Sequence, residues 1–520
     1  LGLCQHRLGA LAEAARACME LGMRDSALTL LDDAAAAWEN NRSVPLDPEW
    51  RELRGSAGRQ VYSALASLLL SDPECDPAQR LHRTYDRLQA FKARTLLERM
   101  LGPGDAAADL QNTEPVTLIE LQEKILEDGE LLLDGFLGPE GSLLFAITRR
   151  TARVVQLPEE KTLHRKLELF YSLLSDSSAK GLADVITPSR VAAALRRELL
   201  GEADDLITGC RRILFAPDGA LNLLPLASLP DPQPGGDAAR EIVASREIVT
   251  IPSATILALQ RRAFSKAPLR TPLRILAVAS SRTAEGELLR GAVAEVRELS
   301  RRYENVEAIV VPEDTCSMPI DGLLSRFDVL HFASHAEVDD QNPWRSTIIL
   351  RPGKETANPR ADRIARMRLP ARLAVLSSCL SGAGRFLSGE GMQGLSTAFL
   401  SAGVPAVVAT LWAVDDRASA RLMEHFYRNL AGGKGAARSL QLAQSALRRE
   451  FPHPYFWAGF VLVGDGDQHL VLKRRSDRSQ TLAIGILSLG AIVVLGVIAV
   501  LAGAGRKWSA RRRANAPRNL

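Results

Sequence analysis

The chain has 520 residues, which is long enough for two or three domains, and its formal net charge is +4 with 24% charged residues. This near balance carries no signal of a nucleic-acid partner, and Lys and Arg are spread through amphipathic stretches in the pattern of solvated faces. Six cysteines are scattered without C-x-x-C spacing, so we expect neither a zinc site nor a secreted disulfide framework, and we assign no cofactor. Reduced thiols fit a cytosolic compartment.

The first hundred residues read as helices. Small and apolar residues fall at the spacing of one tetratricopeptide repeat, whose first helix should end near Gly22: Ala14, Ala15, Cys18, Gly22, Ala27, Leu31 and Ala34. Further helices are expected over 62–70 and 85–100, followed by a Gly- and Pro-rich linker at 101–105. We predict that residues 1–100 are a tetratricopeptide-like region that binds a protein partner. A plain helical bundle packed on the rest is the alternative, because a solenoid needs about three repeats.

The next segment reads as a first α/β unit. A meander of short strands is expected between residues 130 and 157, and a buried strand over 212–216. Between them, 188–200 has the pattern of an amphipathic helix, with Thr187 as its expected cap. This unit has no His and Cys that follow neighbouring predicted strands, so we interpret it as a scaffold.

Two segments further along the chain contain candidate catalytic residues, Asp328 to His335 and Leu373 to Cys379. Each is an apolar run that ends in a residue able to take part in nucleophilic catalysis. We predict buried strands over 329–333 and 373–376 in a mostly parallel sheet, whose carboxyl ends converge in a crevice. A His and a Cys placed there can form a pair in which the imidazole activates the thiol. His331 lies within the strand itself, so we interpret it as structural.

The less specific interpretations are a small hydrophobic core residue for Cys379 and a hydrogen-bonded structural residue for His335. Two features favour a reactive pair. A glycine-rich turn at 380–391 follows the cysteine, frees backbone N–H groups and allows close approach of a substrate. His335 also precedes Cys379 by 44 positions, and the caspase signature has the same order, with its His about 50 residues upstream of the Cys.

From about residue 115 to 465 the chain resembles the CHAT domain, a branch of the caspase, separase and gingipain clan usually joined to tetratricopeptide repeats. The stretches that carry the resemblance are 215–229, 252–255, 330–336, 374–379, 389–395, 398–403, 407–416, 422–427, 443–447 and 453–460. The resemblance implies an α/β fold with a caspase-like, mostly parallel sheet flanked by helices. It places the domain at 111–470, with a scaffold half at 111–265 and a catalytic half at 271–470.

The resemblance also implies a site. His335 and Cys379 would form the catalytic dyad of a cysteine endopeptidase acting on proteins or peptides. The backbone N–H groups of Ala336 and Cys379 would bind the oxyanion of the tetrahedral intermediate. The family pattern usually has Gly directly after the His, whereas this chain has Ala336. If that turn needs a left-handed backbone, Ala336 adds strain, and the alternative is a catalytically degenerate caspase-like scaffold for protein–protein interaction.

In caspase-type folds the segment that leaves the strand expected at 406–411 lines the substrate pocket. By this resemblance Asp415 and Trp412 are the pocket candidates, and an acidic group there would favour Arg or Lys before the cleaved bond. The alternatives are that one of the two aspartates caps the helix expected over 417–430, a role that suits Asp416 better, and that Trp412 serves packing.

The 25 residues 481–505 contain no charged side chain, and as a helix they would span a hydrocarbon core of about 30 Å. We therefore predict a single transmembrane helix at 481–505 that contacts the lipid bilayer, with a basic tail at 506–520. Both flanks of this helix are basic, so the positive-inside rule barely discriminates between its two orientations in the membrane. The expectation of reduced thiols favours a catalytic domain on the cytoplasmic side. The whole sequence predicts a membrane-anchored CHAT-family cysteine endopeptidase that is regulated by, or recruited through, its helical repeat region. The alternative is the degenerate scaffold at the membrane.

Overall fold

The computed structural model describes residues 2–42, 55–101, 114–139, 141–232, 240–264, 272–283, 286–311, 321–339, 341–351, 358–377, 385–387 and 391–475. The linker 102–105 and the candidate nucleophile Cys379 lie outside these residues. The chain divides into two units, residues 1–301 with 305–473, and residues 302–304 with 474–520. In the second unit the N–H of Arg475 donates to the carbonyl oxygen of Arg302 at 2.8 Å.

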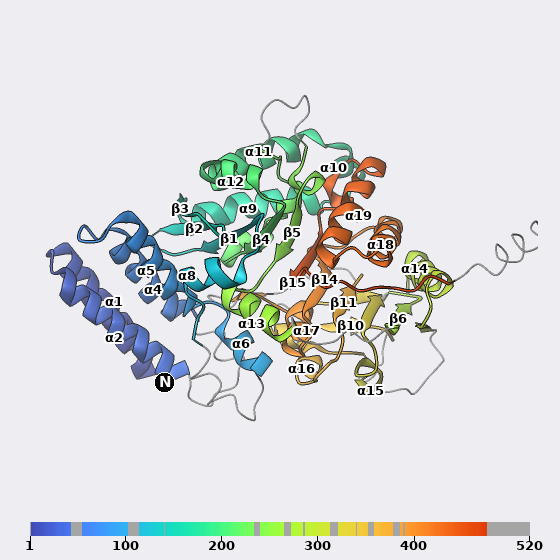
Figure 1. The fold of residues 1–520 in the computed structure, drawn as a ribbon, viewed down its shortest axis with the longest axis horizontal. Coiled ribbons are helices and arrows are strands. Elements are labelled where there is room, and N and C mark those ends of the chain that lie inside the picture. Colours follow the sequence, from blue (N-terminus) through green and yellow to red (C-terminus); the bar gives the residue numbers. More distant parts are fainter. Residues whose placement is uncertain are drawn as a thin grey trace, which may run out of the picture. The chain divides into compact units, whose positions relative to one another are not determined.

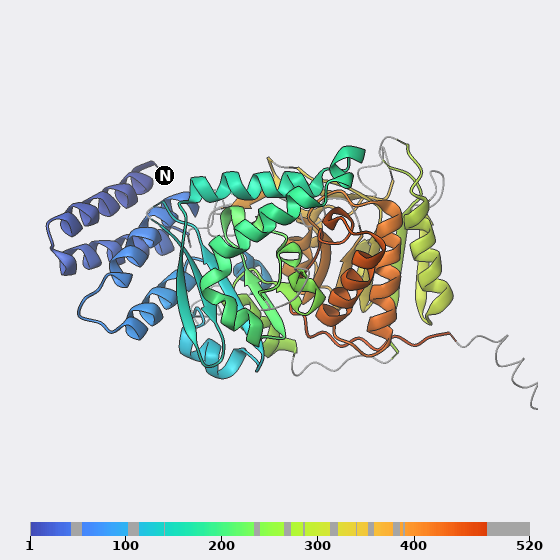
Figure 2. The same ribbon diagram turned by 90° about the horizontal axis from the view of Figure 1, so that it is seen from above.

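The described N-terminal region is helical, as the sequence predicts. Its helices are α1 (Gly2–Glu20), α2 (Arg24–Arg42), α4 (Gly55–Leu70), α5 (Pro77–Gln89) and α6 (Arg94–Leu101). Helices α1 and α2 form a hairpin (Figure 2), and Gly22 makes the turn between them with a φ of +72°. The helix expected over 85–100 is instead interrupted between α5 and α6, where Ala93 has a left-handed backbone with φ +51°.

Helices α4 and α5 are joined to the following strands through buried charged groups. Arg59 of α4 donates two hydrogen bonds to the carboxylate of Asp218, at 2.6 and 2.8 Å. Asp134 is bonded by the α5 side chains Tyr85, at 3.1 Å, and Gln89, at 2.8 Å, and is paired with Lys92 just beyond that helix. Asp134 is 1% exposed and Asp218 is 3% exposed. Both carboxylates therefore depend on the helical region for their positively charged partners, Arg59 and Lys92.

One sheet of eleven strands runs through the molecule in the order β3-β2-β1-β4-β5-β15-β14-β11-β8-β6-β7 (Figure 1). The strands are β1 (Glu130–Phe136), β2 (Ser142–Ile147), β3 (Ala152–Leu157), β4 (Arg212–Ala216), β5 (Glu247–Thr250), β6 (Ile275–Ser280), β7 (Val306–Val311), β8 (Val329–Ala333), β11 (Leu373–Leu376), β14 (Ala406–Thr410) and β15 (Phe460–Gly464). Two ribbons stand outside it, β9 (His335–Glu337) with β10 (Thr347–Ile349), and β12 (Arg385–Leu387) with β13 (Gly391–Gln393). The strands predicted at 329–333 and 373–376 are confirmed.

The sheet contains two parallel blocks of strands that run in opposite directions. Strands β1, β4, β5 and β15 form the parallel block of the first half, which the antiparallel strands β2 and β3 extend, and β14, β11, β8, β6 and β7 form the parallel block of the second half. The halves meet at the antiparallel pair β14 and β15. The prediction of a mixed α/β fold with a large, mostly parallel sheet is therefore confirmed, and the candidate chemistry lies in the second half.

Helices cover both faces of the second half. Alternate residues of β6, β8 and β11 lie in one apolar core with α6, α16 (Ala361–Ile364) and α17 (Leu395–Ser401). The intervening residues face α14 (Arg290–Arg302) and α18 (Asp416–Ala431), beside which lies α19 (Ala436–Glu450). This alternation is what a strand buried on both faces requires.

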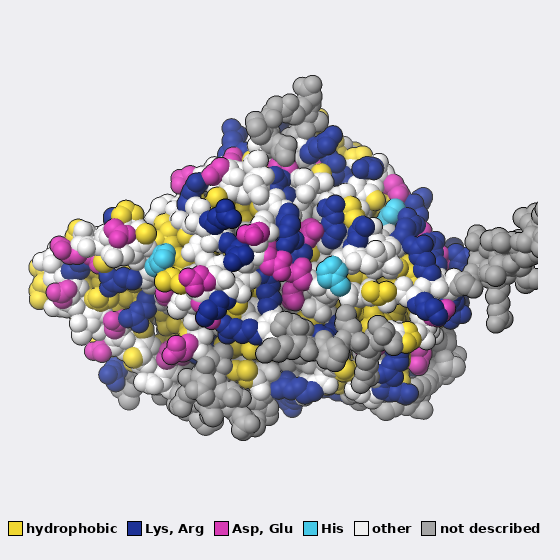
Figure 3. Space-filling model, viewed as in Figure 1, with side chains coloured by type: hydrophobic (Ala, Val, Ile, Leu, Met, Phe, Trp, Pro, Cys, Tyr) yellow, Lys and Arg dark blue, Asp and Glu magenta, His cyan; other side chains and the backbone are white. Residues whose placement is uncertain are grey.

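Helices α9 (Glu160–Ser175) and α11 (Ile186–Leu200) belong to the first half, and α13 (Ala254–Phe264) connects the halves. The expected cap Thr187 lies inside α11 instead. The carboxylate of Asp184 accepts the N–H groups of Ile186 and Thr187, at 3.1 and 3.0 Å. On the face drawn in Figure 3, Lys and Arg side chains are interspersed with Asp and Glu, in keeping with the near-balanced charge.

The predicted membrane localisation is corrected here. Among the residues described above, no helix is both long enough and apolar enough to cross a bilayer. The longest of them, α1 and α2 with 19 residues each, carry charged side chains, which a membrane-spanning helix avoids. The stretch 481–505, on which the prediction of a single-pass protein rested, and the tail 506–520 lie outside the described residues.

Candidate active site

The two segments that carry the candidate residues, 328–335 and 373–379, include the neighbouring parallel strands β8 and β11. Strands β8 and β11 pair in register, with Phe332 opposite Leu376 at their carboxyl ends. His335 follows Phe332 by three positions, and Cys379 follows Leu376 by three positions. The chain therefore leaves two adjacent strand ends with the His and the Cys at equal distances along the sequence. This register is the geometric basis for treating them as a pair.

His335 opens the short strand β9, which pairs antiparallel with β10. Because side chains alternate along a strand, His335 and Glu337 share one face of β9 and Ala336 occupies the other. Ala336 is 3% exposed and packs in the apolar core, whereas His335 is half-buried and Glu337 is exposed. The imidazole therefore lies on the side of β9 that faces away from the core, where a substrate could reach it.

Ala336 occupies the position where the family pattern has Gly, and its backbone shows no strain. The non-glycine residues with positive φ in the described part of the chain are Ala93 and Asn305, so Ala336 is not left-handed. Its partner in β10 is Ile348, whose N–H donates to the carbonyl oxygen of Pro359 at 2.9 Å instead of bonding across the ribbon. In an antiparallel pair this pattern marks a non-hydrogen-bonded position, so the N–H of Ala336 points away from β10.

His331 is fully buried, as its place within β8 predicts. Its Nδ1 lies 3.0 Å from the hydroxyl of Tyr427 in α18, and the two rings meet edge to face. Its Nε2 lies 2.8 Å from a carboxylate oxygen of Glu295 in α14. The ring N–H is not directed at that oxygen, so this contact is an ion-pair distance without hydrogen-bond geometry.

Ser377 extends this buried group to the end of β11. Its hydroxyl lies 3.3 Å from the other carboxylate oxygen of Glu295 and 2.7 Å from the hydroxyl of Ser419 in α18. We call the five residues His331, Glu295, Ser377, Ser419 and Tyr427 the strand-end network. Each of them is less than 9% exposed.

Sequence reasoning missed all members of the strand-end network except His331. One signal for Glu295 was available, since it falls on the buried stripe of α14 together with Ala292, Val296 and Leu299. A carboxylate on an apolar stripe needs a buried partner. The other members come from distant parts of the chain, and nothing in the local sequence marks them.

The structure places the pocket candidates as follows. Asp415 is the N-cap of α18, and its carboxylate accepts the N–H of Ala418 at 2.8 Å. Asp416, expected to be that cap, instead accepts the N–H groups of Gly291 and Ala292 at the start of α14. The cap assignment is therefore the reverse of the expected one, because the side chain of Asp416 is directed at the neighbouring helix.

Trp412 is 2% exposed, and its indole N–H donates to the carbonyl oxygen of Tyr455 at 2.9 Å. Its ring meets Tyr171 edge to face, and the Tyr171 hydroxyl donates to the carbonyl oxygen of Leu411 at 2.6 Å. Burial raises the pKa of Tyr171 to about 12, so this phenol remains a proton donor. These contacts are those of a packed core residue.

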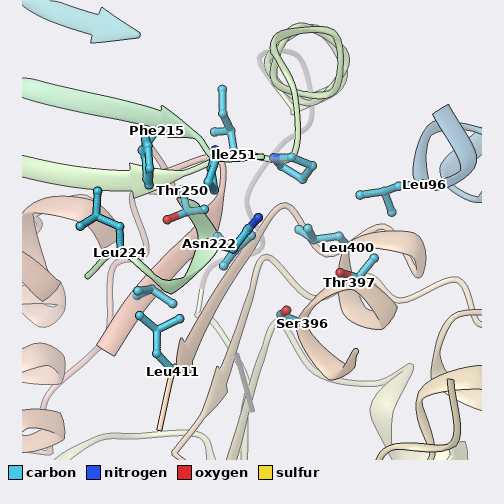
Figure 4. A pocket seen from close by; sticks show the side chains of 14 residues that line it. Leu96, Phe215, Asn222, Leu224, Thr250, Ile251, Ser396, Thr397, Leu400 and Leu411 are labelled. Carbon is cyan, nitrogen blue, oxygen red and sulfur yellow. The ribbon is translucent and has the colours of Figure 1, made fainter. Parts of the chain in front are cut away.

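A cavity of about 60 Å³ lies where the two halves of the sheet meet (Figure 4). Phe215 and Thr250 come from the ends of β4 and β5, and Ser396 and Thr397 from α17. None of the described residues that line it belongs to β8, β9 or β11.

Three carboxylates lie close enough together to hold a cation, Glu127, Glu130 and Asp467. Glu130 and Asp467 are both paired with Arg212 and Arg261, at distances of 2.5 to 3.3 Å. The two guanidinium groups already supply the positive charge, so this cluster is explained by its ion pairs.

Comparison with known proteins agrees with the geometry. A protein-family model described as "CHAT domain" matches residues 187–465, more than half of the chain. Tetratricopeptide repeat protein 28 is 36% identical in Mus musculus and 33% identical in Homo sapiens, each over 128 residues, or 24% of this chain. The match spans only 5% of the length of these curated relatives.

Among solved structures, the Saccharomyces cerevisiae separase–securin complex is similar, with a TM-score of 0.57 and 11% sequence identity. The similarity covers 91% of this chain and 40% of the other chain. At this identity the likeness shows the fold alone. It is the fold that the motifs in the sequence predicted.

Proposed function

Because the chain belongs to the CHAT domain family, whose caspase-like fold is related to cysteine proteases, we propose that it is a cysteine endopeptidase with His335 and Cys379 as its catalytic dyad. The observation that carries the proposal is the register of β8 with β11. It brings together the two strand ends that His335 and Cys379 follow at equal distances along the chain. No other His and Cys pair of the sequence follows neighbouring strands among the described elements.

In this mechanism His335 takes the thiol proton of Cys379, and the thiolate attacks the carbonyl carbon of the scissile peptide bond. The C–N bond of the tetrahedral intermediate then breaks, and the protonated His335 gives its proton to the leaving amine. Water then attacks the thioester while His335 accepts a proton from it. As the thiolate of Cys379 leaves, His335 returns that proton to the sulfur. The thiol is regenerated, and the peptide has gained one water molecule.

The backbone N–H groups of Ala336 and Cys379 would hold the oxyanion during this cycle. The direction of the Ala336 N–H, away from β10, supports this role. The absence of a left-handed backbone at Ala336 removes the strain that would have favoured the degenerate scaffold. Alanine in place of glycine is therefore compatible with an active site.

We further propose that the helical region controls the site. Helix α6 packs in the same apolar core as Ala336, through Leu96 and Leu97. Helices α4 and α5 hold the other half of the sheet through Asp218 and Asp134. A protein partner that binds the N-terminal helices would therefore act on both halves of the sheet. The first 42 residues remain the part of the region available for such a partner.

The proposed substrate preference is a basic residue before the cleaved bond, read by Asp415. One carboxylate oxygen of Asp415 accepts the N–H of Ala418, which leaves the second oxygen for a substrate. A charge-assisted hydrogen bond from an arginine is worth about 1.5–3 kcal/mol.

The proposal is tested with purified wild type, Cys379→Ala and His335→Ala, using a peptide library and a thiol-directed active-site probe. Cys210→Ala is the matched control, because burial raises the pKa of the Cys210 thiol to about 11 and keeps it protonated. Loss of either dyad side chain should lower kcat by several powers of ten, whereas the control should equal wild type. If wild type cleaves nothing and Cys379 resists the probe, the degenerate scaffold is the better description.

A further inference from the structure

We infer that the strand-end network is a positioning device for the His335 and Cys379 pair, an inference that rests on the proposed function. The network lies directly before both candidate residues in the chain. His331 precedes His335 by four positions, and Ser377 precedes Cys379 by two. Its members therefore hold the two strand ends from which the dyad emerges.

The network ties these strand ends to two helices on the same face of the sheet. Glu295 of α14 stands at its centre, with one oxygen 2.8 Å from His331 on β8 and the other 3.3 Å from Ser377 after β11. Two residues of α18 complete the network. The hydroxyl of Tyr427 lies 3.0 Å from Nδ1 of His331, and the hydroxyl of Ser419 lies 2.7 Å from the hydroxyl of Ser377. Four separate elements thus meet through polar contacts that depend on distance and direction.

The strand-end network places polar and charged side chains in the interior of the protein, where apolar residues are the rule. A carboxylate that is 6% exposed is costly to bury, and apolar side chains of similar volume often replace a buried ion pair without loss of stability. Apart from His331, every side chain of β8 and β11 is apolar. Polar contacts at this one level of the sheet are therefore better explained by a need for fixed geometry than by stability.

Geometry is what a dyad on two separate strands needs most. A shift of β8 against β11 by 1 Å would change the separation between an imidazole and a thiol that must transfer a proton, and misplacement of this size can cost about a hundredfold in rate. Apolar packing alone permits small sliding movements, whereas one carboxylate that lies at ion-pair distance from His331 and accepts a hydrogen bond from Ser377 opposes them. The five side chains act through the placement of His335 and Cys379.

The test compares Ser377→Ala and Tyr427→Phe with wild type and with two matched controls. Tyr85→Phe removes the hydroxyl of another fully buried tyrosine, in α5, that bonds a carboxylate, and Ser228→Ala removes another buried serine hydroxyl, in the short helix 226–228; neither residue belongs to the strand-end network. Each variant is checked for folding by thermal unfolding. The first readout is kcat and KM on a cleaved peptide. The second readout is the rate at which iodoacetamide alkylates Cys379 at each pH. Mass spectrometry of the peptide that contains Cys379 measures this rate.

We expect Ser377→Ala and Tyr427→Phe to lower kcat about ten- to a hundredfold with little change in KM. Alkylation of Cys379 at pH 7 should slow about tenfold, and its pH profile should move toward that of a free thiol, because an imidazole held close lowers the pKa of a thiol. Ser377→Thr, which keeps the hydroxyl, should recover most of the rate. The controls should lose stability without a change in either readout.

The inference is overturned if folded Ser377→Ala and Tyr427→Phe match wild type in alkylation profile, or if the controls change the profile equally. The proposed function fails on different results. These are a wild type that is alkylated at Cys379 but cleaves no peptide, or a His335→Ala variant whose alkylation profile equals that of wild type. The alkylation readout needs no substrate, so it tests the positioning role even if no peptide is cleaved.

Discussion

The guanidinium carbon of Arg99 lies 3.7 Å from the centre of the indole ring of Trp344. Arg99 belongs to α6, the last described helix of the N-terminal region, and Trp344 lies in the segment between β9 and β10. The contact therefore joins the helical region to the ribbon that begins with His335. Trp344 is 1% exposed, so this cation–π contact is shielded from water.

Replacing Arg99 with Ala should lower the free energy of unfolding by about 0.5–2 kcal/mol, the usual range for cation–π contacts. Peptide cleavage should fall as well, because the ribbon would be less firmly held. Arg99→Lys should be intermediate, since it keeps the charge and loses the flat stacking surface. Urea unfolding and kcat/KM measure both effects. Arg87→Ala is the control, because Arg87 makes an exposed ion pair with Asp32. Equal unfolding curves for Arg99→Ala and wild type would contradict the prediction.

Two truncations should behave differently. Removal of residues 1–42 should leave a folded protein, because the buried carboxylates of Asp134 and Asp218 keep their partners on α4 and α5. Removal of residues 1–101 should prevent folding, because both carboxylates would lose those partners, and breaking a buried pair costs about 3–5 kcal/mol. Circular dichroism melting curves distinguish the two. A folded, fully active protein without residues 1–101 would instead support an independent repeat domain.

The pair of Asp218 with Arg59 predicts a pH dependence of stability. Burial pushes the pKa of the Asp218 carboxyl upward, but the Arg59 guanidinium outweighs it and holds that pKa below its ordinary value. The unfolded state therefore takes up the proton first as the pH falls, from about pH 4. The contribution of the pair is fully present above that pH and is lost as the pH falls through the folded-state pKa. Urea unfolding between pH 3 and 7 should show this slope, and Asp218→Asn should reduce it. An unchanged slope in the variant would rule out this source.

The variant Ala336→Gly should not increase activity. Ala336 has an extended backbone, so glycine relieves no strain, and its buried methyl group would be lost from the core. We expect a loss of about 1 kcal/mol of unfolding free energy, because glycine in a strand also costs backbone entropy. Cleavage assays and urea unfolding of the two proteins provide the comparison. Activity that appears only in Ala336→Gly would show that the native protein is the degenerate scaffold.

For Asp415 the two roles predict separate effects. As the N-cap of α18 it should contribute about 1 kcal/mol, so Asp415→Ala should lower stability by that amount. As a pocket residue it should also lower kcat/KM for arginine substrates about ten- to a hundredfold and spare other substrates. Asp415→Ser keeps a capping oxygen and separates the two roles. A peptide-library profile of the wild type that shows cleavage after acidic or small apolar residues would remove Asp415 from the pocket.

The local order of residues determined much of this protein. The short apolar runs at 329–333 and 373–376 predicted buried strands, and the residues after them identified His335 and Cys379 as candidates. The motifs spread from residue 215 to 460 identified the CHAT family, and the helices expected over 188–200 and 417–430 lie within α11 and α18. These features depend on neighbours within one turn or one strand, so the sequence displays them directly.

Only the tertiary structure decided which distant side chains share a contact. Asp415 and Asp416 are adjacent, and the position of α14 alone determines which one caps α18 and which one bonds Gly291 and Ala292. Glu295 is marked locally only as a carboxylate on a buried stripe, and its contacts with Ser377 and His331 exist only after α14 packs on the sheet. Likewise, Arg59 and Asp218 are separated by 159 positions, and the closure of that long loop is what makes the helical region part of the folded body.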